Sequence, residues 1–511
     1  VGGALALGGG GGGSSSSGGG GGADPTDRIQ SAVTDTGGAT GAGDTHPNAD
    51  DPEDFRDAEQ IAQEGYESMN TRFAAARGYD GSIYVRDYDT GLLVNDTADG
   101  FIKVAVLDTG VDLDHPDLDA NILTADAVKC TISDGGCVAG GDDTHGHGTF
   151  VAGIIAAEKN AFGMQGIAPK AKILPIAFLN EFDGMTFDGS DVSGVAYATA
   201  EGAHIINASY GLENNLGEEI PIVDATVGTG TDARTPNQLR TLLTAAENGS
   251  NYLTVFNDYV EAHGIMVWAA GNASMDQVGV LSGLPYYFQG TNPGGITGYS
   301  TVNPEAYDWS RNWVAVVALN DSGTLSGYSN QCGISANWCL AASGDINLST
   351  QAGGGYRSWD GTSFAAPNIA GAIAVVMGAF PHLTAEEVLE IIFDTAADLG
   401  VAGTDPIYGR GRVDLEAATD PTSGGWNIVT GPSALSTSFS FESSGFNLSA
   451  PFGDALADLG AQKIAFLDKY KRDFLIPVSS MINTKAGSRD NLNVMQQFGN
   501  SNIPALNDLG A

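Results

Sequence analysis

The sequence predicts an α/β fold in three layers, with a mostly parallel central sheet and helices on both faces. Short apolar runs of strand length occur at residues 103–107, 173–178, 204–208 and 264–270. They alternate along the chain with helical patterns at 189–200 and 238–263. Strands that alternate with helices favour parallel pairing, because each crossover helix returns the chain to the same edge of the sheet. Apolar residues make up 42% of the 511 residues, enough for a sizeable core.

Composition divides the chain into three parts. Residues 1–53 form a low-complexity tether rich in Gly, Ser and acidic residues, a composition that behaves as a flexible coil. Residues 54–420 carry the strand and helix patterns, starting with helical spacing at 54–77, and form the predicted folded domain. Residues 421–511 form a predicted C-terminal linker and extension.

The first residues and the charge both favour secretion. Ala4-Leu5-Ala6 fits the small-x-small pattern at the end of a signal peptide. With 62 acidic and 22 basic residues the net charge is −40, which disfavours nucleic acid and anionic lipid as partners. We interpret this charge as a solvated acidic coat, and calcium binding by some of the carboxylates is the alternative. No stretch has the roughly 18 to 20 apolar residues of a membrane-spanning helix, so we expect none.

The four cysteines occur as two local pairs, Cys130/Cys137 and Cys332/Cys339. Neither pair has zinc-ligand spacing or a second Cys or His pair close by. The pairs predict two short-range disulfides and an oxidising compartment, with four reduced thiols as the alternative. Because a small closed loop stabilises a fold only modestly, such bonds would serve to pin loops.

Three segments contain the residue types that acyl transfer by a serine requires, namely a nucleophile, a base and an acid that orients the base. One segment ends a buried strand in Asp108, followed by Thr109-Gly110. Another places His147 at the start of a helix of small residues. In the third, Gly-Thr-Ser-Phe-Ala-Ala-Pro at 361–367, Ser363 opens a helix whose free amide groups favour negative charge.

Each segment has a simpler interpretation when it is taken alone. Asp-Thr-Gly also occurs in aspartic proteases, and a serine at a helix start is commonly an N-cap. His145 and His147 suggest a metal site, but alternating residues of an extended chain point to opposite sides, which disfavours a shared metal.

In the order Asp, His, Ser, the three segments together resemble the subtilases, the subtilisin-like serine peptidases. The resemblance covers roughly residues 60–420. It implies that Asp108, His147 and Ser363 form a catalytic triad that excludes His145. It also implies a secreted, monomeric endopeptidase that acts on polypeptides and needs no cofactor for its chemistry.

The same resemblance identifies residues around the reacting groups. The Ala-Ala-Gly-Asn stretch at 269–272 implies that the Asn272 side chain and the Ser363 backbone N–H form an oxyanion hole. The residues implied to contact substrate are Ser209, Tyr210, Gly211, Ala269, Ala270 and Gly271. Their small and apolar character predicts a preference for large apolar side chains on the acyl side of the cleaved bond.

The sequence departs from the subtilase pattern at several positions. Phe150 replaces a second histidine, Phe364 replaces the usual Met, and Asp360 replaces Asn or Ser. These changes affect the expected rate and preference, since none of them removes a catalytic group. Residues 213–257 form a longer segment than in compact subtilases, in a position to rim or cover the cleft.

Two further features follow from the resemblance. The loop at 158–164 resembles a calcium loop, in which Asn160 and Asp117 would supply side-chain oxygens to a structural Ca²⁺. The glycine-rich start and residues 452–474 resemble the bacterial autotransporter peptidases, which implies a link to an outer-membrane barrel beyond this chain.

Two rival functions remain to be tested. A catalytically silent subtilase fold used for binding would be expected to lack a triad residue, and none is missing. A sedolisin-type acid peptidase shares the Gly-Thr-Ser segment, but it would need a Glu base and a carboxylate at the oxyanion position. The segments of His147 and Asn272 disfavour it, and a pH optimum near neutrality would exclude it.

Overall fold

The computed structural model describes residues 5–6, 68–86, 93–95, 100–131, 136–179, 190–214, 216–228, 235, 238–239, 241, 243, 251–287, 308–345, 347–421, 426–430, 433–439, 446–447, 463–477 and 482–483. The chain divides into two compact units. The first comprises Val1–Tyr84 and Asn95–Thr419, and the second comprises Val85–Val94 and Asp420–Ala511. The domain limits near 53 and 420 stay predictions. Apart from Leu5–Ala6, the predicted tether lies outside the described residues.

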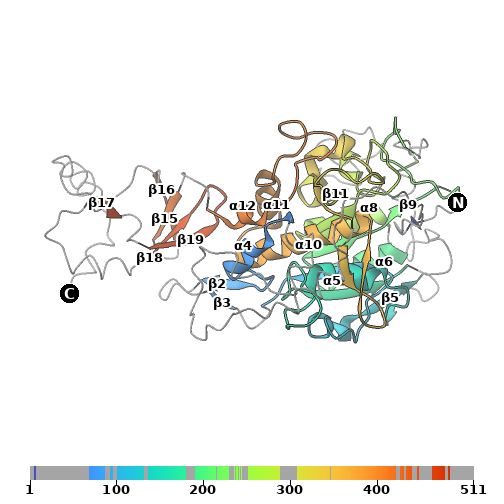
Figure 1. Cartoon of the computed structure of the whole chain (residues 1–511), viewed down its shortest axis with the longest axis horizontal. Helices are drawn as coiled ribbons and strands as arrows, with labels where there is room; N and C mark the ends of the chain where they lie inside the picture. The colour runs from blue at the N-terminus through green and yellow to red at the C-terminus, as the bar shows by residue number, and fades with distance from the viewer. Residues whose placement is uncertain are drawn as a thin grey trace, which may run out of the picture. The chain divides into compact units, whose positions relative to one another are not determined.

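An eight-stranded sheet forms the centre of the first unit, in the order β12-β11-β10-β8-β4-β7-β5-β6. Its strands β5 and β11 are labelled in Figure 1. Its strands are β4 (Lys103–Asp108), β5 (Val128–Thr131), β6 (Gly136–Ala139), β7 (Lys172–Ala177), β8 (Ile205–Ala208), β10 (Ile265–Ala269), β11 (Trp313–Leu319) and β12 (Cys339–Ser343). Every neighbouring pair is parallel except β5 and β6. The predicted, mostly parallel α/β fold is confirmed.

Helices cover both faces of this sheet. On one face, α5 (His147–Ala156) and α10 (Thr362–Ala379) contact each other and the strands, and on the other, α6 (Ser190–Ala200) packs against α8 (Tyr252–Glu261). Strand β4 shows why both faces need cover. Its side chains alternate, so that Ala105 and Leu107 join the core beside α6 and α8, while Val104 and Val106 point the other way.

The remaining described helices and strands are short. In the first unit they include α4 (Thr71–Ala76), α11 (Ala385–Asp394), α12 (Leu415–Thr419), β9 (Gly211–Leu212), β13 (Asn347–Thr350) and β14 (Tyr356–Trp359). Leu5–Ala6 (β1) pairs antiparallel with β9. Helix α11 begins with a capping box made by Thr384 and Glu387. Of the helix expected at 54–77, the described part is α4.

The second unit contains a four-stranded sheet in the order β16-β15-β18-β19. Its strands are β15 (Trp426–Thr430), β16 (Ser433–Phe439), β18 (Lys463–Leu467) and β19 (Asp473–Pro477). All of its pairs are antiparallel. A hairpin joins β18 to β19, and within it the Arg472 guanidinium donates to the Asp468 carboxylate at 2.6 Å, with both side chains buried.

Both predicted disulfides are present. Cys130–Cys137 joins the paired strands β5 and β6, and Cys332–Cys339 joins the residues on either side of a single 3₁₀ segment, Gly333–Trp338. Each bond closes a short loop, as expected for loop pins.

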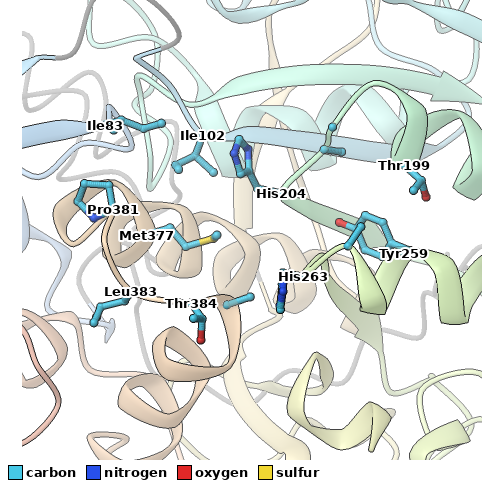
Figure 2. A pocket seen from close by; sticks show the side chains of 14 residues that line it. Ile83, Ile102, Thr199, His204, Tyr259, His263, Met377, Pro381, Leu383 and Thr384 are labelled. Carbon is cyan, nitrogen blue, oxygen red and sulfur yellow. The ribbon is translucent and has the colours of Figure 1, made fainter. Parts of the chain in front are cut away.

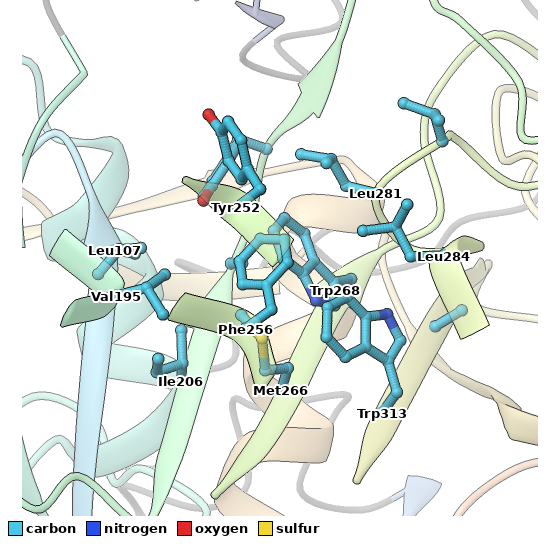
Figure 3. Close-up of a cluster of buried hydrophobic side chains, with 14 of the residues drawn as sticks. Leu107, Val195, Ile206, Tyr252, Phe256, Met266, Trp268, Leu281, Leu284 and Trp313 are labelled. Atoms are coloured by element: carbon cyan, nitrogen blue, oxygen red, sulfur yellow. The ribbon is translucent and has the colours of Figure 1, made fainter. Parts of the chain in front are cut away.

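An aromatic cluster forms the centre of the core on the α8 face (Figure 3). The Trp268 ring of β10 stacks on the Trp313 ring of β11 with centroids 5.6 Å apart, and Phe256 of α8 meets Trp313 edge-on at 5.4 Å. All three side chains are fully buried. Because β10 leads directly into Asn272, this cluster supports the strand that carries a candidate site residue.

Among the described helices, α10 has the length and mean hydropathy (1.4) of a membrane span, but 94% of that window is buried inside the protein. Its apolar character is that of the central helix of the core.

Replacing Trp268 with Ala should remove this packing and leave a cavity. We expect a loss of about 3–5 kcal/mol in the free energy of unfolding, measured by urea denaturation. Phe162→Ala is the control, because that ring is 53% exposed and its loss should cost far less. Equal losses in the two variants would contradict the assigned role of the cluster.

Candidate active site

Asp108 is the last residue of β4 and is completely buried. Its Oδ1 accepts a hydrogen bond from the Thr109 N–H at 2.7 Å and lies 2.7 Å from His147 Nδ1. An ionised carboxylate only accepts, so this contact assigns the proton of the neutral imidazole to Nδ1. His147 Nε2 is therefore left as an acceptor, and it is buried without a hydrogen bond from any described residue.

Small residues allow α5 to approach the end of β4. A Cβ on Gly148 would overlap the carbonyl oxygen of Gly110, and a Cβ on Gly110 (φ 108°) would overlap the backbone of Gly141. Glycine at these two positions brings the first turn of α5, and with it His147, against Asp108.

Asp143, which the sequence analysis did not select, holds the start of α5. Its Oδ1 accepts from the N–H groups of His145 and Gly146, both at 2.9 Å, and its Oδ2 accepts from the Thr149 N–H at 2.9 Å. It also accepts from the Thr109 hydroxyl at 3.0 Å. One buried carboxylate thus satisfies free amides at the helix start and ties them to the end of β4.

Ser363 is the second residue of α10 and is also buried. Its Oγ donates to the Ser209 carbonyl at 3.2 Å, while the Ser209 hydroxyl donates to the Ser363 carbonyl at 2.7 Å. No hydrogen bond between Ser363 Oγ and His147 Nε2 occurs among the described residues. The structure therefore brings Asp108 and His147 into direct contact and holds Ser363 against the residue that follows β8.

Aromatic rings surround His147. Phe364 lies 5.2 Å from the imidazole and Trp359 lies 5.8 Å away, measured between ring centroids. Phe150 in turn packs on Phe364 at 4.4 Å. The two phenylalanines that depart from the subtilase pattern are therefore neighbours in one apolar cluster. His145 lies 6.5 Å from His147, and the described residues contain no group of three metal-ligating side chains.

Asn272 follows β10, and its side chain is oriented by the residue before Ser363. Its Oδ1 accepts from the Thr362 N–H at 2.9 Å and the Thr362 hydroxyl at 3.0 Å. Since Oδ1 is held in this way, Nδ2 is the free donor of the amide, and it bonds to none of the described residues.

The predicted substrate-contacting residues lie at the carboxyl ends of β8 and β10, with Ala269 as the last residue of β10. The Tyr210 side chain does not face a cleft: it is 2% exposed and packs between Phe178 at 4.8 Å and Trp268 at 5.2 Å. Ala270 is also fully buried, so these positions present mainly backbone.

The predicted calcium residues do come together, but in an arrangement that does not suit a cation. Asp117 Oδ1 accepts from Asn160 Nδ2 at 3.0 Å, and Asp117 Oδ2 accepts from the Met164 N–H at 3.0 Å and the Tyr356 hydroxyl at 3.1 Å. Asn160 Oδ1 is itself used by the Phe162 N–H at 2.9 Å. In this arrangement hydrogen-bond donors stand where Ca²⁺ would need oxygen ligands, and the calcium site stays a prediction.

Burial raises the pKa of Asp117 from 3.8 to about 6, against the opposing effect of these donors. Three neutral donors, from Asn160, Met164 and Tyr356, orient this carboxyl.

A cavity lies at the opposite end of the sheet (Figure 2). Among its lining residues are Ile102 and His204, and His204 Nδ1 accepts from the Lys103 N–H at 3.0 Å. Lys103 is the first residue of β4 and Asp108 is the last. The cavity and the Asp108–His147 pair therefore lie at opposite ends of the strands.

A parallel α/β sheet with Asp, His, Ser and Asn at the carboxyl ends of its strands and the helix starts beside them defines a serine-hydrolase class of site. The subtilase family model (Peptidase_S8) matches residues 100–411, and the chain belongs to the subtilase family. It is 28% identical over 421 residues to an extracellular serine protease of Serratia marcescens, covering 72% of this chain and 34% of that protein.

Two further relatives cover the same region. Fervidolysin of Fervidobacterium pennivorans is 30% identical, over 63% of this chain and 42% of that protein. Subtilisin DY of Bacillus licheniformis is 28% identical, over 62% of this chain and 90% of that protein. The chain thus spans nearly all of the compact subtilisin but less than half of the two longer relatives.

On the arrangement described, we expect calcium to stabilise the wild-type chain and the Asn160→Ala variant equally, because the Asn160 side chain donates to Asp117 and accepts from the Phe162 N–H. The measurement is the shift in Tm between excess EGTA and excess CaCl₂. A ligand at one hundred times its Kd adds about 2.7 kcal/mol to the free energy of unfolding. A calcium-dependent rise in Tm that is present in the wild type and lost in Asn160→Ala would contradict this expectation and support the predicted calcium site.

Proposed function

We propose that this chain is a secreted serine endopeptidase that cleaves peptide bonds through an acyl-enzyme on Ser363. The observation that carries the proposal is the buried 2.7 Å contact between His147 Nδ1 and Asp108, which leaves Nε2 as a free acceptor. An imidazole held in this tautomer is a general base ready to receive a hydroxyl proton.

In the proposed reaction, the Ser363 hydroxyl turns from the Ser209 carbonyl toward His147 Nε2. His147 takes the hydroxyl proton as Oγ attacks the substrate carbonyl carbon, and Asp108 stabilises the imidazolium. The tetrahedral intermediate then expels the amine, which leaves with the proton from Nε2, and an ester on Ser363 remains. Water attacks the ester with His147 again as base, which releases the acid and restores the Ser363 hydroxyl.

Asn272 Nδ2 and the Ser363 N–H are proposed to donate to the oxyanion. The hydrogen bonds from Thr362 to Asn272 Oδ1 support this role, because they orient the amide before the reaction begins. A donor that needs no reorganisation lowers the barrier more than a mobile one.

Substrate backbone is proposed to pair with the strand that follows Ser209. The antiparallel pairing of Leu5–Ala6 with β9 supports this, because it shows that an extended segment fits this edge. The predicted pocket residues Ser209, Tyr210, Gly211, Ala269, Ala270 and Gly271 belong to the same proposal, with Tyr210 contributing backbone only.

Secretion is supported by the two disulfides, the acidic composition and the similarity to a protease named as extracellular. A monomeric state, and a connection through residues 421–511 to an outer-membrane barrel beyond this chain, complete the proposal.

Ser363→Ala should abolish hydrolysis of a mixed peptide library, and Asn272→Ala should lower kcat with little change in KM. In subtilisin itself, loss of the oxyanion asparagine costs about 10²–10³ in kcat and loss of the serine about 10⁶, and we carry these family magnitudes over. Product formation by mass spectrometry at neutral and acid pH provides the measurement.

Activity that persists in Ser363→Ala would contradict the proposal. Activity confined to acid pH would favour the sedolisin-like alternative. A folded but inactive wild type would favour the silent binding fold.

A further inference from the structure

Residues 213–214 and 216–222, in the first part of the segment that is longer than in compact subtilases, form the two arms of a hairpin beside the candidate site. Glu213 and Glu219 face each other in an antiparallel bridge, and the Asn214 N–H donates to the Glu218 carbonyl at 2.7 Å. The returning arm bonds on two sides: the Ile220 N–H donates to Leu212 of β9, and the Ile220 carbonyl accepts from Val280, each at 2.9 Å. The arm therefore lies between β9 and the residues that follow the Asn272 loop.

The Glu219 carboxyl reaches the backbone of the candidate oxyanion residue. Oε2 accepts from the Asn272 N–H at 2.9 Å, and Oε1 accepts from Asn330 Nδ2 at 2.8 Å. Gly271 (φ 109°) makes this approach possible, because a Cβ at that position would overlap the Glu219 carboxyl.

Asn330 holds the same loop from the other side. It is fully buried, its Oδ1 accepts from the Ala273 N–H at 3.1 Å and the Met275 N–H at 2.9 Å, and its own N–H donates to the Gly271 carbonyl at 3.0 Å. Glu219 and Asn330 thus bind the backbone of the loop at 271–275, while Thr362 binds the Asn272 side chain.

We propose that Glu219 is a positioning residue for catalysis: with Asn330 it fixes the backbone of Asn272, so that Nδ2 is held where the oxyanion forms. The inference rests on the proposed function and assigns a role to the first part of the 213–257 segment. Because an oxyanion donor acts mainly in the transition state, its displacement should appear in kcat and not in KM.

The charge of Glu219 provides a second readout. Burial, and to a smaller extent Glu213 across the bridge, raises the pKa of Glu219 from 4.5 to about 8, against the hydrogen bonds from Asn272 and Asn330. The carboxyl of Asp276, which follows the loop at 271–275, accepts from the Thr226 N–H at 2.9 Å. Below pH 8 the Glu219 carboxyl is mostly neutral. Above pH 8 it becomes an anion beside the loop that must stabilise a negative oxygen, so kcat should fall.

The contribution of Glu219 to the free energy of unfolding also falls as pH rises. The folded state holds the Glu219 proton more tightly than the unfolded chain does, so the contribution of this group to stability is complete below about pH 4.5. It is lost as pH rises through 8.

The test compares kcat and KM of the wild type, Glu219→Ala and Glu219→Gln on one peptide across neutral and alkaline pH. Glu219→Ala should lower kcat about tenfold or more, the order expected for the loss of a partly buried hydrogen bond, with KM nearly unchanged. Glu219→Gln keeps one acceptor oxygen, so its loss at neutral pH should be smaller, and the alkaline fall in kcat near pH 8 should disappear.

Glu218→Gln is the matched control, because Glu218 is exposed on the same hairpin and accepts only from Asn214 Nδ2 at 2.9 Å among the described contacts of its side chain. It should behave as wild type. If Glu219→Ala fails to fold, Glu219→Gln and the pH profile of the wild type still test the proposed role of Glu219.

A fall in kcat near pH 8 that persists in Glu219→Gln would overturn the inference. So would a rise in KM at constant kcat in the Glu219 variants, which would assign Glu219 to substrate binding or to packing. Wild-type kinetics in both Glu219 variants beside an inactive Ser363→Ala would also overturn it, while leaving the proposed function intact. Persistent activity in Ser363→Ala would instead remove the proposed function.

Discussion

The contact between Asp108 and His147 is the interaction on which the rest of the site depends, because it joins the end of the central strand to the start of a helix. It requires two backbones to come closer than side chains normally permit, and Gly148 against Gly110 permits this approach. The free amides that the approach buries are then satisfied by Asp143. The orientation of the base is thus a consequence of how β4 and α5 pack.

Hydrogen bonds between neighbouring segments also hold the residues on the Ser363 side of the site. Thr362 bonds the Asn272 side chain, and Ser209 and Ser363 exchange hydrogen bonds. The candidate oxyanion donor is therefore held by the residue before the nucleophile, and the nucleophile by the residue that follows β8. Phe150 and Phe364, two of the departures from the family pattern, pack together beside His147. An apolar surround of this kind also keeps water away from the imidazole and strengthens its bond to Asp108.

Two carboxyls outside the triad show how the same chemical group serves different ends. Asp117 is held by three donors where the family resemblance had suggested a cation, while Glu219 reaches over a glycine to the backbone of Asn272. Burial raises the pKa of each. What distinguishes them is position: one supports a loop at the edge of α5, and the other lies beside the residue proposed to stabilise charge.

The sequence by itself determined the fold class, the disulfide pairs and the identity of the candidate triad and oxyanion residues, because each depends on a local pattern: an apolar run, a close cysteine pair or a short motif. Tertiary structure alone decided the roles of Asp143, Glu219 and Asn330, the burial of the Tyr210 ring and the donors around Asp117. Asn272 bonds a carboxyl 53 positions away and Glu219 bonds an amide 111 positions away. No local pattern encodes such contacts, since they arise only when the packed strands bring distant loops to one edge of the sheet.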